Sequence, residues 1–107
     1  MYRGTTPNIV IKINSDIDLS TMEQIWVTFK SKSAEKNYDI DKLEINTEEK
    51  TIGVTMSQAD TLAFQTDLNQ ANRVEVQLRL LDNEGIAYAS SITSIPLYRI
   101  LKEGVIS

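Results

Sequence analysis

The chain contains no cysteine and no histidine. Without cysteine it can form no disulfide and offers no thiolate as a nucleophile or metal ligand. Without histidine it lacks the side chain most often used as a general base near neutral pH, which is also the commonest metal ligand. A Ser-His-Asp or Cys-His catalytic arrangement is therefore impossible, and we expect neither a cofactor nor a bound metal.

Other site signatures are also missing. The four glycines are far apart in the sequence, so there is no glycine-rich phosphate loop. Asp16 with Asp18 and Asp39 with Asp41 could offer oxygens to a hard cation, but neither pair has the glycine and distal glutamate of a calcium loop. Paired carboxylates can hydrolyse glycosides without histidine, yet no acidic residue lies in an apolar run that would raise its pKa. The sequence predicts a protein that is not an enzyme.

Positive charge is scarce and dispersed. Eleven Lys and Arg residues against fifteen Asp and Glu give a net charge of −4. Proteins that bind nucleic acid usually have the opposite balance, so we expect no nucleic-acid partner. No apolar run approaches the length needed to cross a bilayer, and residues 1–7 lack the apolar stretch of a secretory signal. We expect no membrane contact and synthesis in the cytoplasm.

What is present is the composition of an ordinary globular domain. The 107 residues are 41% hydrophobic and 24% charged, and that length suits one hydrophobic core. We therefore expect a single domain over residues 1–107.

Apolar and polar residues alternate in several short segments, which is typical of half-buried strands. Alternation is clearest in Arg73–Leu81, and in Glu23–Ser31 it places Trp26 on the face opposite Ile25, Val27 and Phe29. The expected strands are Asn8–Asn14, Glu23–Ser31, Tyr38–Ile40, Leu43–Ile45, Lys50–Met56, Arg73–Leu81 and Ile86–Thr93. Asp82 to Gly85 predicts a hairpin turn, because Gly85 can adopt a positive φ.

Helical signals are few. Ser57 can cap a brief helix of about two turns that ends near Thr66, and Ser20 with Glu23 has capping-box spacing for one helical turn. About seven short strands with one short helix between the fifth and sixth predict an all-β, antiparallel immunoglobulin-like sandwich. The antibody cysteine pair is missing, so the strand order stays open.

Candidate contact residues lie on one strand face and in the tail. An exposed Trp26 could anchor an interface or stack on a sugar, or a neighbouring loop could cover it. The tail Ile95–Ser107, which Pro96 interrupts as a strand, is an edge extension or a projecting arm, and its apolar residues could dock on their own core or on a neighbour. The interface candidates are Trp26, Tyr88, Leu97, Tyr98, Ile100, Leu101, Val105 and Ile106.

Three stretches carry a resemblance to a known family, namely Tyr2–Pro7, Val74–Leu81 with Gly85, and Ile100–Ile106. Together with Trp26–Phe29 and Asp60–Leu62 they resemble short proteins of tailed phages and prophages of Gram-positive bacteria, encoded near tail and baseplate genes. The resemblance implies a structural or adaptor part of the phage tail or baseplate, made in the host cytoplasm and located in the virion. It carries no catalytic motif.

Two functions from different classes follow. The first is a structural or adaptor protein that binds itself or other phage tail proteins through sheet edges and terminal segments. The alternative is a carbohydrate-binding or adhesion module that uses Trp26 and nearby tyrosines.

Overall fold

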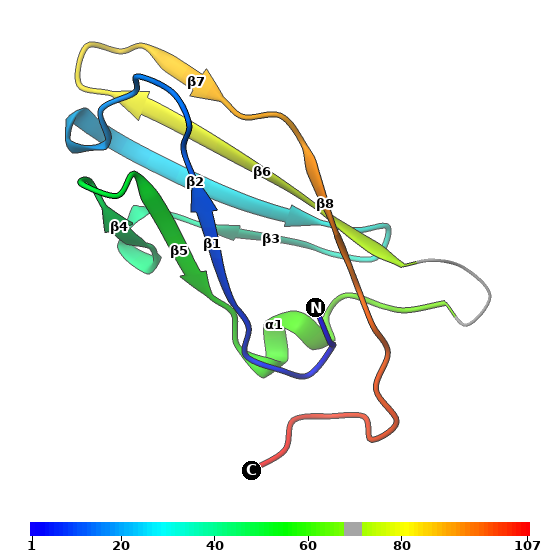
Figure 1. The fold of residues 1–107 in the computed structure, drawn as a ribbon. Helices are drawn as coiled ribbons and strands as arrows, with labels where there is room; N and C mark the ends of the chain where they lie inside the picture. The colour runs from blue at the N-terminus through cyan, green and yellow to red at the C-terminus, as the bar shows by residue number, and fades with distance from the viewer. Residues whose placement is uncertain (68–71) are drawn as a thin grey trace.

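The computed structural model describes residues 1–67 and 72–107 and is an antiparallel β-sandwich (Figure 1). One sheet has three strands in the order β1-β5-β4, and the other has five, β3-β2-β6-β7 with β8 also on β6. The strands are β1 (Asn8–Lys12), β2 (Met22–Lys30), β3 (Glu35–Tyr38), β4 (Glu44–Asn46), β5 (Thr51–Thr55), β6 (Arg73–Asp82), β7 (Ala87–Ala89) and β8 (Thr93–Pro96). The predicted all-β sandwich is confirmed, with its short helix α1 (Gln58–Leu62) between β5 and β6.

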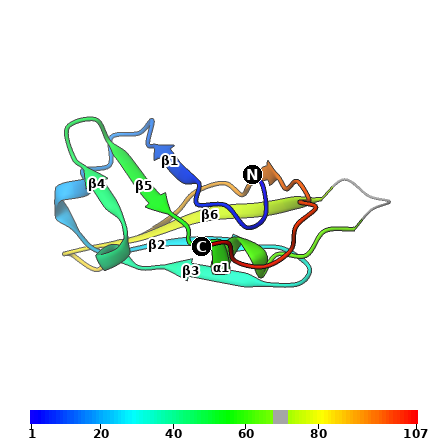
Figure 2. The same cartoon turned by 90° about the horizontal axis from the view of Figure 1, so that it is seen from below.

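The core lies between the two sheets, as the alternation of β2 and β6 predicts. Ile25, Val27 and Phe29 of β2 are at most 1% exposed, and β6 buries the alternate residues from Val74 to Leu80. Ile52 and Val54 of β5 face them from the other sheet, which Figure 2 shows lying across the larger one. All of these side chains belong to one hydrophobic cluster.

Two strand predictions need correction. The third strand, expected at Tyr38–Ile40, is β3 and begins earlier at Glu35, whereas Ile40–Lys42 forms a 3-10 turn. A hairpin joins β3 to β2, so this edge strand is held by backbone bonds although only Tyr38 is buried. The expected strand Ile86–Thr93 is limited to β7, because the ladder is interrupted at Ser90, whose hydroxyl instead of a backbone carbonyl accepts the Leu78 N–H at 2.9 Å. A separate strand, β8, begins at Thr93 and extends beyond the expected range to Pro96.

Helical predictions were right in place and wrong in extent. Ser57 Oγ accepts the Asp60 N–H at 3.1 Å and caps α1, which ends at Leu62 well before Thr66. The turn at Leu19–Thr21 is capped by Asp18, not by Ser20, because the Asp18 carboxylate accepts the Ser20 N–H and hydroxyl. None of the helices in residues 1–67 and 72–107 is long and apolar enough to cross a membrane.

The strand directions place different turns and termini at the two ends of the molecule, which is 47 Å long. The connections from β1 to β2 and from β4 to β5 share one end with the β6–β7 turn, where Gly85 has the expected positive φ of 82°. Both termini, α1 and the β2–β3 turn lie at the opposite end (Figure 1).

Candidate interaction site

The two terminal segments pair with each other beyond β8. Tyr2 and Tyr98 form a parallel bridge, with the Tyr98 N–H donating to the Met1 carbonyl at 2.7 Å and the Arg3 N–H to the Tyr98 carbonyl at 3.1 Å. The Met1 nitrogen donates to the Pro96 carbonyl at 2.7 Å. Residues 1–3 therefore cover the outer edge of the strand that continues β8, and Pro96 lacks the N–H that an incoming strand would accept.

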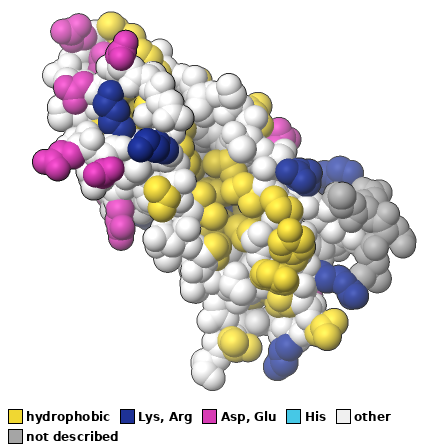
Figure 3. All heavy atoms as spheres, in the orientation of Figure 1, with side chains coloured by type: hydrophobic (Ala, Val, Ile, Leu, Met, Phe, Trp, Pro, Cys, Tyr) yellow, Lys and Arg dark blue, Asp and Glu magenta, His cyan; other side chains and the backbone are white. Residues whose placement is uncertain are grey.

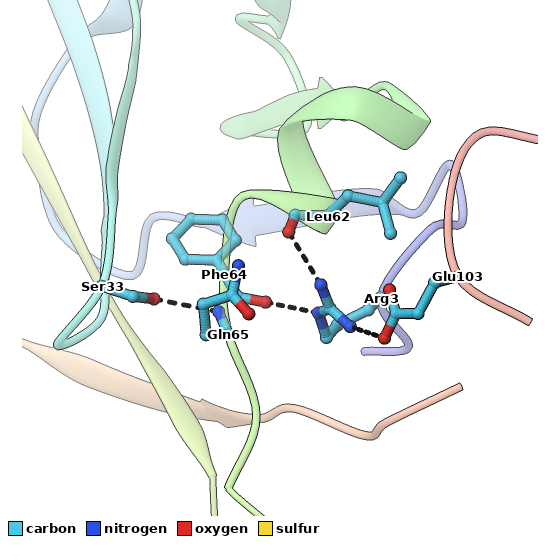
Figure 4. Close-up of polar contacts among 6 residues, drawn as sticks. All are labelled: Arg3, Ser33, Leu62, Phe64, Gln65 and Glu103. Atoms are coloured by element: carbon cyan, nitrogen blue, oxygen red, sulfur yellow. Dashed lines mark hydrogen bonds and ion pairs between the residues drawn. The ribbon is translucent and has the colours of Figure 1, made fainter. Parts of the chain in front are cut away.

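Arg3 links the N-terminal segment to the end of α1 and to the C-terminal tail (Figure 4). Its side chain is buried and donates to the carbonyls of Phe64 at 2.6 Å and Leu62 at 3.0 Å, and to the Glu103 carboxylate at 2.6 Å. It thus bonds the carbonyls left free where α1 ends. No local sequence pattern indicates this role of Arg3, because its partners are 59 to 100 residues away in the chain.

The C-terminal tail folds back on its own chain. The Gln58 side chain accepts the Ile106 N–H at 2.8 Å and donates to the Ile106 carbonyl at 3.0 Å. Leu97 is buried in the core, and Ile100 is half-buried. Tyr98, Leu101, Val105 and Ile106 remain exposed, Leu101 by 89%. Of the two alternatives for the tail, the structure therefore has docking on the same molecule, with apolar side chains left outside.

Trp26 lies where the strand pattern put it, on the outer face of the five-stranded sheet. Its side chain is 40% exposed and pairs in register with Arg79 on β6. The surface around it is hollowed by about 390 Å³ and is also lined by Gln24, Thr28 and Asn37. An aromatic ring among hydrogen-bonding side chains can stack on a sugar ring or anchor a protein contact.

β1 has a free backbone edge. The hydrogen bonds from Met56 N to Pro7 O and from Ile13 N to Lys50 O flank its ladder with β5. Bonded pairs recur at every second residue of an antiparallel ladder, so Ile9 and Ile11 direct their backbone groups toward β5. The N–H and C=O groups of Asn8, Val10 and Lys12 then point away from β5, where β1 has no other strand partner in the described part of the chain.

An apolar groove lies beside this edge. It runs between β1 and the β7–β8 edge, and β6 forms its floor. The half-buried Ile9 and Ile11 line one wall, and Tyr88 and Ile95 line the other. Figure 3 shows hydrophobic side chains gathered here and toward the N-terminal segment. Tyr88, predicted as an interface residue, is therefore part of this groove, whereas Trp26 lies on another face.

The titratable groups with shifted pKa values have structural partners. Burial and a hydrogen bond to the Asp60 carboxylate at 2.5 Å raise the pKa of Tyr38. Hydrogen bonds from Ser20 lower the pKa of Asp18. Among residues 1–67 and 72–107 no three acidic side chains converge as a metal site would require. Tyr38 and Asp18 thus take part in a strand contact and a turn.

The chain matched no family model, no curated protein and no solved structure.

Proposed function

We propose that this chain is a non-catalytic structural or adaptor protein that assembles with copies of itself or with other proteins. The contacts are made by the free β1 edge and by the terminal segments. The setting is the tail or baseplate of a phage particle, as the resemblance of its terminal and β6 sequences implies.

The carrying observation is the free edge of β1 beside an apolar groove. Soluble proteins usually protect edge strands with charge, proline, short length or a covering segment, because unpaired backbone groups template pairing with another chain. β4 and β7 have three residues each, β3 carries Glu35 and Lys36, and residues 1–3 cover the end of β8. On β1 the central outer residue is Val10, which is 60% exposed.

The terminal segments support the same proposal. Leu101, Val105 and Ile106 are apolar and exposed, and the tail that carries them is held by Gln58 and Arg3. Binding a partner there could bury them without unfolding the core, because the buried Leu97 lies before them in the chain.

Sedimentation velocity over a wide concentration range tests the proposal. We expect concentration-dependent association that is lost in Val10→Lys or after removal of residues 101–107, with Thr47→Lys in an exposed turn as the matched charge control. Truncation starts after Ile100 so that Leu97 stays in the core. A wild-type chain that stays monomeric at the highest concentration, or association that both variants retain, would contradict the proposal.

A second function, carbohydrate binding or adhesion, is favoured by the hollow around Trp26. Trp26 is the single tryptophan, so its fluorescence reports directly on a sugar placed against it. We expect glycan-dependent quenching, and loss of glycan binding by calorimetry in Trp26→Ala but not in Tyr98→Ala. An unchanged emission across a broad glycan panel would exclude this function.

A further inference from the structure

The two sheets of the sandwich differ in width. β7 and β8 pair with successive parts of the same edge of β6, so the larger sheet is β3, β2, β6 and this divided strand across. The smaller sheet has only β4, β5 and β1. It stops at β1, and the apolar groove lies beyond it, between β1 and β7–β8. One more strand beside β1 would therefore cover the apolar groove.

Charge is distributed unequally along the long axis, as Figure 3 shows. Carboxylates gather at the end that holds the β6–β7 turn, and Lys and Arg gather at the end that holds the termini. The acidic end carries Asp16, Asp18, Glu23, Asp39, Asp41, Glu44, Glu48, Glu49, Asp82 and Glu84 against Lys12, Lys42 and Lys50. The basic end carries Arg3, Lys30, Lys32, Lys36, Arg73, Arg99 and Lys102 against Glu35, Asp60, Asp67, Glu75 and Glu103.

We propose that the partner at β1 is a second copy of this chain, and that the two β1 strands pair antiparallel about a two-fold axis with Val10 opposite Val10. This inference rests on the proposed function and specifies its partner and its edge. The pairing joins the three-stranded sheets of both copies into one and lays each β1 beside the groove of the other copy, next to Ile9 and Ile11.

The sequence of β1 fits this register. Asn8, Val10 and Lys12 carry the outward backbone groups, and with Val10 opposite Val10 each of them meets another outward residue. Val10 of one copy then contacts Val10 of the other, and Lys12 of each copy lies opposite Asn8 of the other. A shift that put Lys12 opposite Lys12 would place like charges directly across the ladder, which is destabilising.

The charge distribution selects the antiparallel orientation. β1 runs from the basic end of the molecule to the acidic end. Antiparallel pairing therefore places the acidic end of each copy beside the basic end of the other, whereas a parallel arrangement would bring like ends together. Complementary fields favour the correct encounter and disfavour the alternative.

Cysteine crosslinking tests the register directly, because the natural chain has no cysteine that could interfere. Residues opposite one another in a bonded antiparallel pair have Cα atoms about 5.5 Å apart, within the range that a disulfide spans. We expect Val10→Cys to form a covalent dimer about tenfold faster or more than Ser94→Cys, since pairing raises the local thiol concentration to about the mM range. Ser94 is the matched control, an exposed residue on the β8 edge.

Two further variants distinguish antiparallel from parallel pairing. Asn8→Cys and Lys12→Cys should each crosslink poorly alone and readily when the two proteins are mixed. Raising the ionic strength from about 0.1 M to about 1 M shortens the Debye length from about 10 Å to about 3 Å and should weaken the dimer. Unmixed crosslinking at position 8 or 12, preferred crosslinking at Ser94→Cys, or a dimer strengthened by salt would overturn the inference.

The outcomes separate this inference from the proposed function. Association of the natural chain without crosslinking at Val10→Cys overturns the β1–β1 dimer and leaves an assembly protein that uses other contacts. A natural chain that is monomeric in sedimentation, together with no crosslink in any of the four cysteine variants, overturns both.

Discussion

Of the two strand edges that flank the apolar groove, one is covered by another segment of the chain and the other is open. The strand that continues β8 is covered by residues 1–3, which Arg3 fastens to the end of α1, and Pro96 withdraws one donor from this edge. β1 has no such cover in the described part of the chain, and its outward side chains are Asn8, Val10 and Lys12. Changes at the β8 edge should therefore lower folding stability, whereas changes at the β1 edge should weaken association.

The largest effect should separate two neighbours within β1. Ile11→Pro removes an N–H that donates to a backbone carbonyl of β5, and it should lower the free energy of unfolding by about 3 kcal/mol or more. Val10→Pro removes an outward N–H and should cost less than about 1 kcal/mol while abolishing association. Denaturant unfolding of both variants measures this, and equal losses would mean that the β1 edge is not oriented as described.

Arg3→Ala should be the most damaging change on the covered side. It leaves the buried carbonyls of Leu62 and Phe64 without their charged donor, and we expect a loss of about 2–4 kcal/mol. Glu103→Gln is the matched control and should cost less than about 1 kcal/mol, because the Glu103 side chain is 63% exposed. Thermal or denaturant unfolding decides, and similar small losses in both variants would mean that Arg3 does not hold the terminal segments.

Gly4 follows the covering residues 1–3 and lies where there is little space for a side chain. Its φ is 70°, and an added Cβ would lie 2.9 Å from Ile100 Cδ1. Gly4→Ala should therefore lower the free energy of unfolding by about 2 kcal/mol, and Gly104→Ala by about 1 kcal/mol, because nothing lies within 4 Å of a Cβ at Gly104. Equal losses would show that Ile100 does not pack against Gly4.

The smallest effect concerns β3, whose end is held by α1 through Tyr38 and Asp60. The pKa of Tyr38 is raised on folding, so its protonated phenol contributes stability that is complete below about pH 10 and is lost as the pH rises further. Tyr38→Phe should cost about 1 kcal/mol at neutral pH and should reduce the alkaline loss. Unfolding curves from neutral to alkaline pH test this, and an unchanged alkaline slope would exclude Tyr38 as its source.

The sequence predicted the parts of this molecule that depend on local periodicity. Alternation in β2 and β6 identified their buried faces and put Trp26 outside. β3 was misplaced because Glu35 to Asn37 has no apolar alternation, since an edge strand is held by backbone bonds to one neighbour. The sheet edges needed the strand order, and the contacts of Arg3 needed the tertiary fold. The separation of acidic and basic residues between the two ends depends on where the strands begin and end, so the net charge of the sequence did not indicate it.

Association through the outward backbone of β1 can be followed residue by residue by amide hydrogen exchange at Val10 and Lys12. We expect both amides to exchange rapidly in dilute protein and to become protected as the concentration rises, while the Ser94 amide on the β8 edge shows no such change. Rapid exchange of Val10 and Lys12 at concentrations where sedimentation shows association, or protection already present in the monomer, would contradict the account.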